Sequence, residues 1–167
     1  MFDDYIFSPR RPGQRVWLRD YGPYPFVTNI EEMAGRNRFF RVALWTGEHL
    51  QLTLMSIEPG DDIGLELHTD LDQFIRIERG QGLVLMGNDS DCLDYRTRVY
   101  DGYVIFIPAG TWHNLINIGR TPLKLYSIYA PPAHPHGTVQ ERKEDAEEYS
   151  TEENEPLIDF AEGREYN

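Results

Sequence analysis

Apolar and polar positions between about residues 37 and 132 form short runs separated by turns. The runs with strand-like alternation or β-branched and aromatic content are 39–45, 50–57, 74–78, 83–86, 103–107, 115–118 and 123–129. Turn-forming sequences such as Pro59-Gly60, Asp101-Gly102 and Pro108-Ala109-Gly110 lie between them. Short strands with turn signals at spacings of roughly 8–12 residues are typical of all-β sandwiches and barrels and not of βαβ units. We therefore predict an all-β domain.

The pattern changes on both sides of this region. Residues 1–27 are rich in proline and aromatic side chains, which excludes a helix and favours an extended arm that lies on another surface. Thr28 and Glu31 have the spacing of a capping box and predict a short helix that begins near Ile30. After Pro132 the strand pattern stops. We predict three parts: an N-terminal arm (1–27), a barrel with a leading helix (28–137) and an acidic C-terminal helix or tail (138–167).

Composition narrows the possible partners. The chain has 167 residues, the length of about one domain, and a net charge of −12, which argues against a nucleic-acid partner. Residues 138–167 contain 11 Asp/Glu and 3 Lys/Arg and so carry most of the net negative charge. The simplest explanation of this acidic segment is a solvated helix face or tail, and the alternative is a docking surface for a basic partner. The single Cys92, the acidic first residues and the absence of a long apolar segment predict a cytoplasmic protein without a membrane span.

Two segments carry candidate chemistry. In the first, Glu66 and His68 are two residues apart, so on a strand their side chains share one face. A polar four-residue connection follows, and Gln73 begins the next strand, so a hairpin can bring Gln73 beside that pair. In the second segment, a strand ends in a Pro/Gly turn and His113 lies just past it. A metal ion needs donors from more than one strand within about 2.0–2.2 Å, which positions close to turns on paired strands provide.

These segments resemble the two motifs of the cupin superfamily, over about residues 38–132. The second motif, G-x5-P-x-G-x2-H-x3-N, is matched throughout by Gly102, Pro108, Gly110, His113 and Asn117. The first motif, G-x5-H-x-H-x3-4-E-x6-G, is matched at Gly60, His68 and Gly80, whereas Glu66 stands at its first His position and Gln73 at its Glu position. The resemblance implies a jelly-roll β-barrel with a metal ion inside, commonly in a homodimer.

The resemblance also implies a ligand set. Phosphomannose isomerases of this superfamily use a similar Gln/His/Glu/His set, and the chain is similar to small single-domain cupins of the mannose-6-phosphate isomerase-like type. The expected ligands are Glu66, His68, Gln73 and His113, and the expected cofactor is one divalent ion per chain, Mn, Fe, Ni or Zn. Three alternatives stay open: core histidines bonded to backbone, a Glu66 that acts as a free acid or base or points outward, and a Gln73 that only hydrogen-bonds a ligand.

Several other polar residues are given no role in the site. His134 and His136 flank Pro135 and are interpreted as part of a surface loop after the barrel. Arg76 and Glu78 share the strand face opposite to Gln73, so we expect them outside the barrel.

The function that this pattern favours is a metal-dependent enzyme acting on a small oxygen-rich molecule by Lewis-acid catalysis. An isomerase acting on a sugar or sugar phosphate and a dioxygenase are both compatible with it. The alternative is a non-catalytic cupin that binds a small ligand or uses the metal only to brace the fold. No residue is assigned as catalytic.

Overall fold

The computed structural model describes residues 17–146. Within that range the elements follow in the order α1 (Ile30–Arg36), β1 (Arg41–Thr46), β2 (Gln51–Ile57), β3 (Asp72–Arg79), β4 (Gly82–Gly87), β5 (Tyr95–Val99), β6 (Val104–Ile107), β7 (Trp112–Asn117), β8 (Leu123–Ala130) and β9 (Val139–Gln140), and residues 143–146 are also helical. In the same range, the helical segments lack the length and apolar character needed to cross a membrane. The all-β prediction is confirmed.

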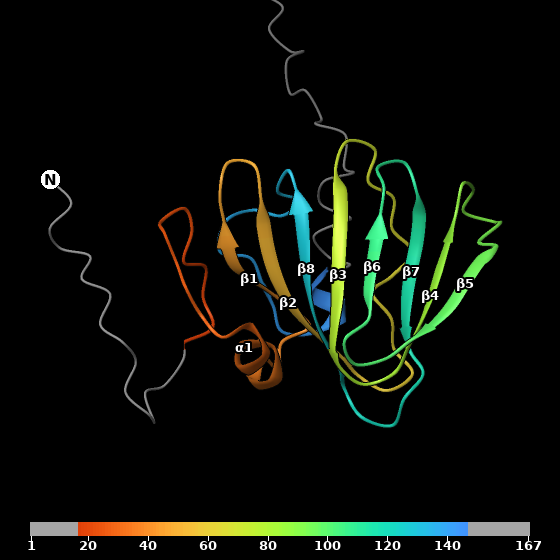
Figure 1. The fold of residues 1–167 in the computed structure, drawn as a ribbon, viewed down its shortest axis with the longest axis horizontal. Helices are drawn as coiled ribbons and strands as arrows, with labels where there is room; N and C mark the ends of the chain where they lie inside the picture. The colour runs from red at the N-terminus through yellow and green to blue at the C-terminus, as the bar shows by residue number, and fades with distance from the viewer. Residues whose placement is uncertain (1–16, 147–167) are drawn as a thin grey trace, which may run out of the picture.

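The strands form two sheets, of order β6-β3-β8-β2-β1-β9 and β5-β4-β7. Figure 1 shows β1, β2, β8, β3 and β6 side by side, followed by β7, β4 and β5. All strand pairs are antiparallel. Isolated bridges from the β2–β3 connection to β7 extend the smaller sheet, joining Asp62 to Ile116 and Glu66 to His113. This is the jelly-roll arrangement expected from the sequence.

The interior of the larger sheet is divided into a polar and an apolar zone. Near one end, Gln51 on β2 and Gln73 on β3 both pair with Tyr129 on β8, and all three are buried. Next to this row, the buried Thr53 pairs with Ser127. The following rows contain only apolar side chains, which join the main core cluster: Met55, Ile57, Ile77, Leu123 and Leu125. Hydrophobic burial thus stabilises one end of the barrel, while the other end is left for polar chemistry.

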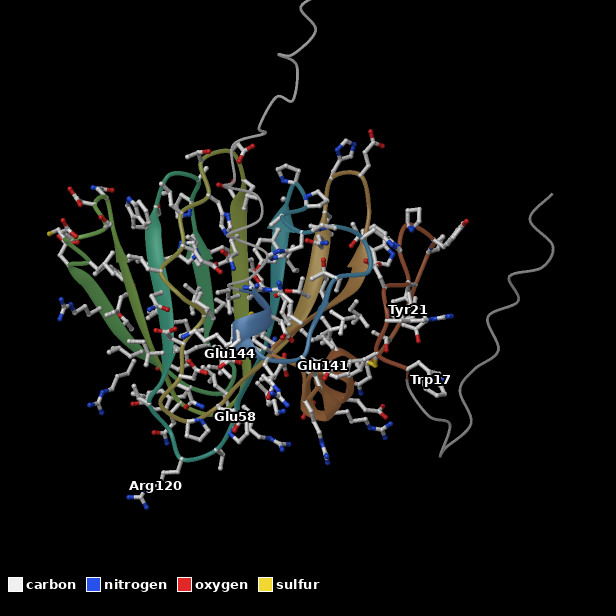
Figure 2. The ribbon with its side chains drawn as sticks, turned by 180° about the vertical axis from the view of Figure 1, so that it is seen from behind. Trp17, Tyr21, Glu58, Arg120, Glu141 and Glu144 are labelled. Atoms are coloured by element: carbon white, nitrogen blue, oxygen red, sulfur yellow. The ribbon has the colours of Figure 1, made fainter. Side chains whose placement is uncertain are left out.

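A second apolar cluster covers the outer face of β1 and β2. Met33 and Ala34 of α1 pack there against Val42, Leu44 and Leu54, with Leu18, Tyr21 and Phe26 at the edge. Figure 1 places α1 below β1 and β2, and Figure 2 shows Tyr21 on the chain segment beside them. The described part of the predicted arm, residues 17–27, therefore lies on another surface of the protein, as expected.

The helix begins at Ile30, as expected, but its N-cap lies one residue later than the capping-box interpretation placed it. Its N-cap is Asn29 and not Thr28: the Asn29 side chain accepts a hydrogen bond from the Glu32 backbone N–H at 3.1 Å. The same three-residue spacing occurs one step along the chain, and asparagine caps a helix as well as threonine does. Sequence spacing alone could not choose between the two.

Two strands were not expected from the sequence. β5 contains Arg96 and Arg98 and lies at a sheet edge, so its side chains are mostly exposed and the apolar signal is absent. β9, two residues long, falls inside the predicted C-terminal segment and pairs with β1 through Arg41–Gln140 and Val42–Val139. The division into arm, barrel and tail remains a prediction, and residues 1–16 and 147–167 of the arm and tail lie outside the described residues.

Asp20 joins three parts of the fold. Its carboxylate accepts hydrogen bonds from the backbone N–H groups of Gly22 and Thr46 at 2.9 Å each, from the Thr46 hydroxyl at 2.5 Å and from the Gly137 N–H at 3.0 Å. Its side chain is 1% exposed. Burial opposes ionisation of Asp20, but the hydrogen bonds from Thr46, Gly137 and Gly22 and the nearby His136 outweigh it and lower its pKa.

We expect Asp20→Asn to lower the free energy of unfolding by about 2 kcal/mol at pH 7, because charge-assisted hydrogen bonds are lost. A carboxylate whose pKa is lowered by folding stabilises the protein above its unfolded pKa of about 3.9, and that contribution is lost as the pH falls through the folded value. The difference in free energy of unfolding between wild type and variant, measured by urea unfolding, should therefore become smaller below about pH 4. Asp70→Asn, at an exposed position, is the matched control. If the difference in free energy of unfolding between wild type and Asp20→Asn did not change with pH, this role for the Asp20 charge would be contradicted.

Candidate metal centre

The segment that carries Glu66 and His68 is fixed against β7 by backbone hydrogen bonds. The Glu66 N–H donates to the His113 carbonyl at 2.9 Å, and the His113 N–H donates back to the Glu66 carbonyl at 3.0 Å. The Gly110 N–H donates to the His68 carbonyl at 2.7 Å. Gly110 has a φ of 79°, a conformation that favours glycine. This motif residue therefore forms the turn whose N–H is hydrogen-bonded to the segment of Glu66 and His68.

His113 is oriented by its own turn. It is the second residue of β7 and is 1% exposed. Its Nδ1 lies 2.9 Å from the Thr111 carbonyl oxygen, which can only accept a hydrogen bond, so Nδ1 carries the proton. The Nε2 lone pair is then free, as it is in histidines that bind a metal through this atom.

Three donor side chains meet at one point. Glu66 Oε2 lies 3.7 Å from His68 Nε2 and 3.7 Å from His113 Nε2, and the ligand atoms of all three residues lie within 4.8 Å of one another. The two imidazole rings have their centroids 5.6 Å apart. Both Nε2 atoms are buried and have no hydrogen-bond partner within residues 17–146. The structure therefore brings together three of the four residues expected from the motifs.

Glu66 is held in its ionised form. Its second oxygen, Oε1, accepts a hydrogen bond from the Arg41 guanidinium at 3.2 Å, and its side chain is 22% exposed against 4% for Arg41. Burial opposes ionisation, but His113, His68 and the Arg41 charge together hold the Glu66 pKa well below its usual range. The carboxylate points at both imidazoles and not outward.

Gln73 occupies the adjoining row of the barrel interior. It is 4% exposed, and its strand partner Tyr129 presents an aromatic edge to His68, with ring centroids 5.9 Å apart. The Gln73 Nε2 donates to the Ser127 hydroxyl at 2.9 Å, whereas its Oε1 is buried and has no hydrogen-bond partner among the described residues. An amide oriented in this way presents only its carbonyl oxygen, the atom that binds a cation.

The residues fit a divalent cation. Two imidazole nitrogens and one ionised carboxylate form a mixed N/O donor set that suits Zn, Fe, Ni or Mn. Buried polar atoms without a partner cost roughly 1–3 kcal/mol each, and both imidazole Nε2 atoms are in that state within the described chain. An ion bound among Glu66, His68 and His113 would satisfy both nitrogens.

A cavity of about 820 Å³ gives access to this centre. Arg41, Glu66 and His68 line it together with residues 133–140 of the segment after β8. Figure 2, from behind, shows that segment continuing to Glu141 and Glu144 in front of the strands. The donor group thus faces a space large enough for a small molecule.

Two residues near the centre were missed by the sequence analysis. Arg41 was counted only as part of a strand, although a single charge inside an apolar run indicates a buried ion pair. His134 was assigned to a surface loop, but it lines the cavity and its Nε2 is buried. No local pattern distinguishes it from His136, which is 57% exposed.

Other polar residues have structural roles. Asn117, the last residue of the second motif, is 1% exposed and donates to the carbonyls of Ile57 at 2.8 Å and Thr121 at 2.9 Å, so it ties two connections together and takes no part in the donor group. Arg76 and Glu78 form an ion pair of 3.1 Å on the face opposite to the buried Gln73, Ile75 and Ile77, as expected.

Comparison with known proteins identifies the family. The family model for the cupin domain matches residues 53–129, which include Gln73, His68 and His113. The YrkC protein of Bacillus subtilis is 61% identical over 133 residues, which are 80% of this chain and 72% of that protein. The chain belongs to the cupin family. A protein of Acanthamoeba polyphaga mimivirus is 44% identical over 119 residues, 71% of this cupin and 72% of that protein.

The crystal structure of BH2720 from Bacillus halodurans is similar to this cupin with a TM-score of 0.77. It is 63% identical in sequence, and the match covers 78% of this chain and 98% of that one. The family resemblance and the jelly-roll fold expected from the two motifs are therefore confirmed. The likeness to mannose-6-phosphate isomerase-like cupins remains a prediction.

Proposed function

We propose that this cupin binds one divalent metal ion through Glu66, His68, Gln73 and His113, and that it acts on a small oxygen-rich molecule in the adjoining cavity. The observation that carries the proposal is the donor group itself. Glu66 Oε2 is 3.7 Å from both imidazole Nε2 atoms, and neither of these has another partner in residues 17–146.

A bound ion would supply Lewis-acid polarisation of a ligand oxygen. The chain's own residues set the conditions for this. Glu66 stays ionised, His113 is fixed in one tautomer by Thr111, and the Arg41 charge offsets that of Glu66. With a divalent ion the local charge is then net positive, which favours a ligand that carries or develops negative charge on oxygen. Sugars, sugar phosphates and oxygen-bearing acids have this chemistry.

The first test is metal binding, followed by turnover. Purified protein is analysed for its elements as isolated, and the metal-free protein is titrated with Mn(II), Fe(II), Ni(II) and Zn(II). We expect about one ion per chain for at least one of them. The metal-loaded protein is then incubated with sugar phosphates. In a separate assay, the protein loaded with iron is incubated with catechols in the presence of oxygen. Binding without any turnover, together with a thermal stability that depends on metal, would favour the non-catalytic role. Failure to bind any of the four ions would overturn the proposal.

The pH dependence of metal retention distinguishes the donors. An imidazole with a reference pKa near 6.5 must be neutral to ligate, whereas Glu66, with its lowered pKa, remains ionised at acid pH. We expect the metal to be lost below about pH 6, because protons compete with the metal ion for imidazole nitrogen. Elemental analysis after dialysis between pH 7.5 and pH 4 measures this. Constant occupancy down to about pH 4.5 would contradict ligation by histidine.

A further inference from the structure

The lining of this cavity contains a histidine outside the donor group, and that histidine is positioned by the core. His134 follows β8 and lines the same cavity as Glu66 and His68. Its ring lies edge-on to Tyr129, with centroids 5.1 Å apart, and Tyr129 in turn contacts His68. The three rings thus form a continuous row from the donor group to the segment 133–140, which also lines the cavity.

The backbone of His134 is fixed by a buried glutamine. Gln51, which is fully buried on β2, accepts a hydrogen bond from the His134 N–H at 2.9 Å and donates one to the His134 carbonyl at 2.8 Å. The same side chain also bonds the Ala133 N–H at 3.2 Å and the Thr46 hydroxyl at 2.9 Å. Because its N–H and its carbonyl are both hydrogen-bonded to a buried side chain of the sheet, this loop residue is positioned as firmly as a residue on a strand.

The imidazole itself has an unused polar atom. His134 Nε2 is buried and has no hydrogen-bond partner within residues 17–146. Burial and the Arg41 charge lower the pKa of His134 to about 3, so the ring is neutral at physiological pH. A neutral imidazole offers one donor and one acceptor nitrogen. His136, two residues further on, differs: its Nε2 lies 3.0 Å from the Gly22 carbonyl oxygen and 3.6 Å from Asp20.

His134 lies close to the donor group without belonging to it. The group whose ligand atoms all lie within 4.8 Å of one another contains Glu66, His68 and His113, and it does not include His134. Glu66, His68 and Arg41 nevertheless act electrostatically on His134. A side chain in this position can reach a molecule bound beside the ion while leaving the ion to its own ligands.

We propose that His134 is the residue of this cupin that hydrogen-bonds the ligand held at the metal centre, and that Gln51 positions it. This inference rests on the proposed function. It narrows the ligand class to molecules that bear a hydrogen-bonding group, a hydroxyl, a carbonyl or an N–H, next to the oxygen that faces the ion.

The test uses full-length protein loaded with Co(II) and the probe acetohydroxamate, which chelates through two adjacent oxygens and carries a neighbouring N–H. Co(II) uptake and probe binding are both followed by visible absorption. We expect His134→Ala to leave the Co(II) content and affinity within twofold of wild type and to weaken probe binding by about tenfold, or about 1.4 kcal/mol. His134→Gln, which retains a polar group, should recover part of that loss.

His49→Ala is the control, since it removes a histidine whose side chain is 85% exposed and lies outside the cavity lining. It should change probe binding by less than twofold. Unchanged probe binding in His134→Ala would overturn the role of His134 but leave the metal centre in place. Loss of Co(II) in that variant would also overturn this role, because His134 would then be a metal ligand. Failure of wild-type protein to bind Co(II) would overturn the metal centre and this inference with it. Failure of the Co(II) protein to bind the probe would overturn only the inference.

The positioning role of Gln51 has its own readout. Gln51→Met keeps the side-chain length and removes the hydrogen bonds to the loop. It should weaken probe binding in the wild-type background and cause no further weakening when residue 134 is already alanine, because residues that act as a unit are not additive. Equal weakening in both backgrounds would show that Gln51 does not act through His134.

Discussion

His113→Ala is expected to lower the bound divalent metal by at least an order of magnitude. His113 is the most deeply buried of the three converging donors, and its tautomer is fixed by the Thr111 carbonyl. Alanine removes the Nε2 atom, and neither Glu66 nor His68 can replace it, because both already face the same point. Elemental analysis of protein purified at pH 7.5 and metal titration of the metal-free variant both measure the loss.

The control for this experiment is His49→Ala. His49 lies in the turn between β1 and β2 with its side chain 85% exposed, so its removal should leave metal content unchanged. His68→Ala serves as a second variant, since its side chain is 22% exposed and its replacement disturbs packing less than that of His113. Folded variants of both His68 and His113 that retain wild-type metal content would rule out the proposed centre.

Arg41→Met is expected to destabilise the metal-free protein by about 2 to 3 kcal/mol. The Arg41 guanidinium donates to Glu66 at 3.2 Å and to the Gln140 side chain at 2.9 Å, and its own side chain is 4% exposed. Removing one partner of a buried ion pair leaves the other charge uncompensated, at a cost of about 3–5 kcal/mol; the partial exposure of Glu66 reduces this. Urea unfolding of metal-free protein at pH 7.5 gives the value.

The metal-loaded protein should lose less stability on the same substitution. A divalent ion beside Glu66 supplies the positive charge that Arg41 provided, so the carboxylate is no longer unpaired. Arg36→Met is the matched control: Arg36 and its partner Glu32 are 55% and 43% exposed, and an exposed ion pair contributes about 0–1 kcal/mol. An equal loss with and without metal would show that Glu66 and the ion do not interact.

Much of the barrel and part of the site could be predicted from the sequence, because both depend on local patterns. Alternating apolar residues mark strands that bury one face, and the spacing of Gly102, Gly110 and His113 fixes the turn that presents the imidazole. Glu66 and His68, two residues apart, lie on one side as expected and converge on His113. Metal ligation by Gln73 stays a prediction, although the orientation of its amide supports it.

The parts that could not be predicted depend on contacts between distant segments. Arg41 meets Glu66 across 25 positions of sequence, and Gln51 fixes His134 across 83. The strand β5 was missed for a different reason: it is an exposed edge, so its side chains carry no burial pattern. Neither the predicted homodimer nor the predicted cytoplasmic location follows from the local pattern of one chain. Both stay predictions.

Two separate stretches of the chain line the cavity: the barrel segment 63–68 forms a first wall and residues 133–140 form a second. The donor group that would retain an ion belongs to the first wall and to β7, whereas the second wall is fastened to the sheet by Gln51 and Asp20. Substitutions in the second stretch can therefore alter which molecule is accepted while the cation-holding residues remain intact. A library restricted to positions 133–140 would be the economical way to redirect this protein toward a new compound.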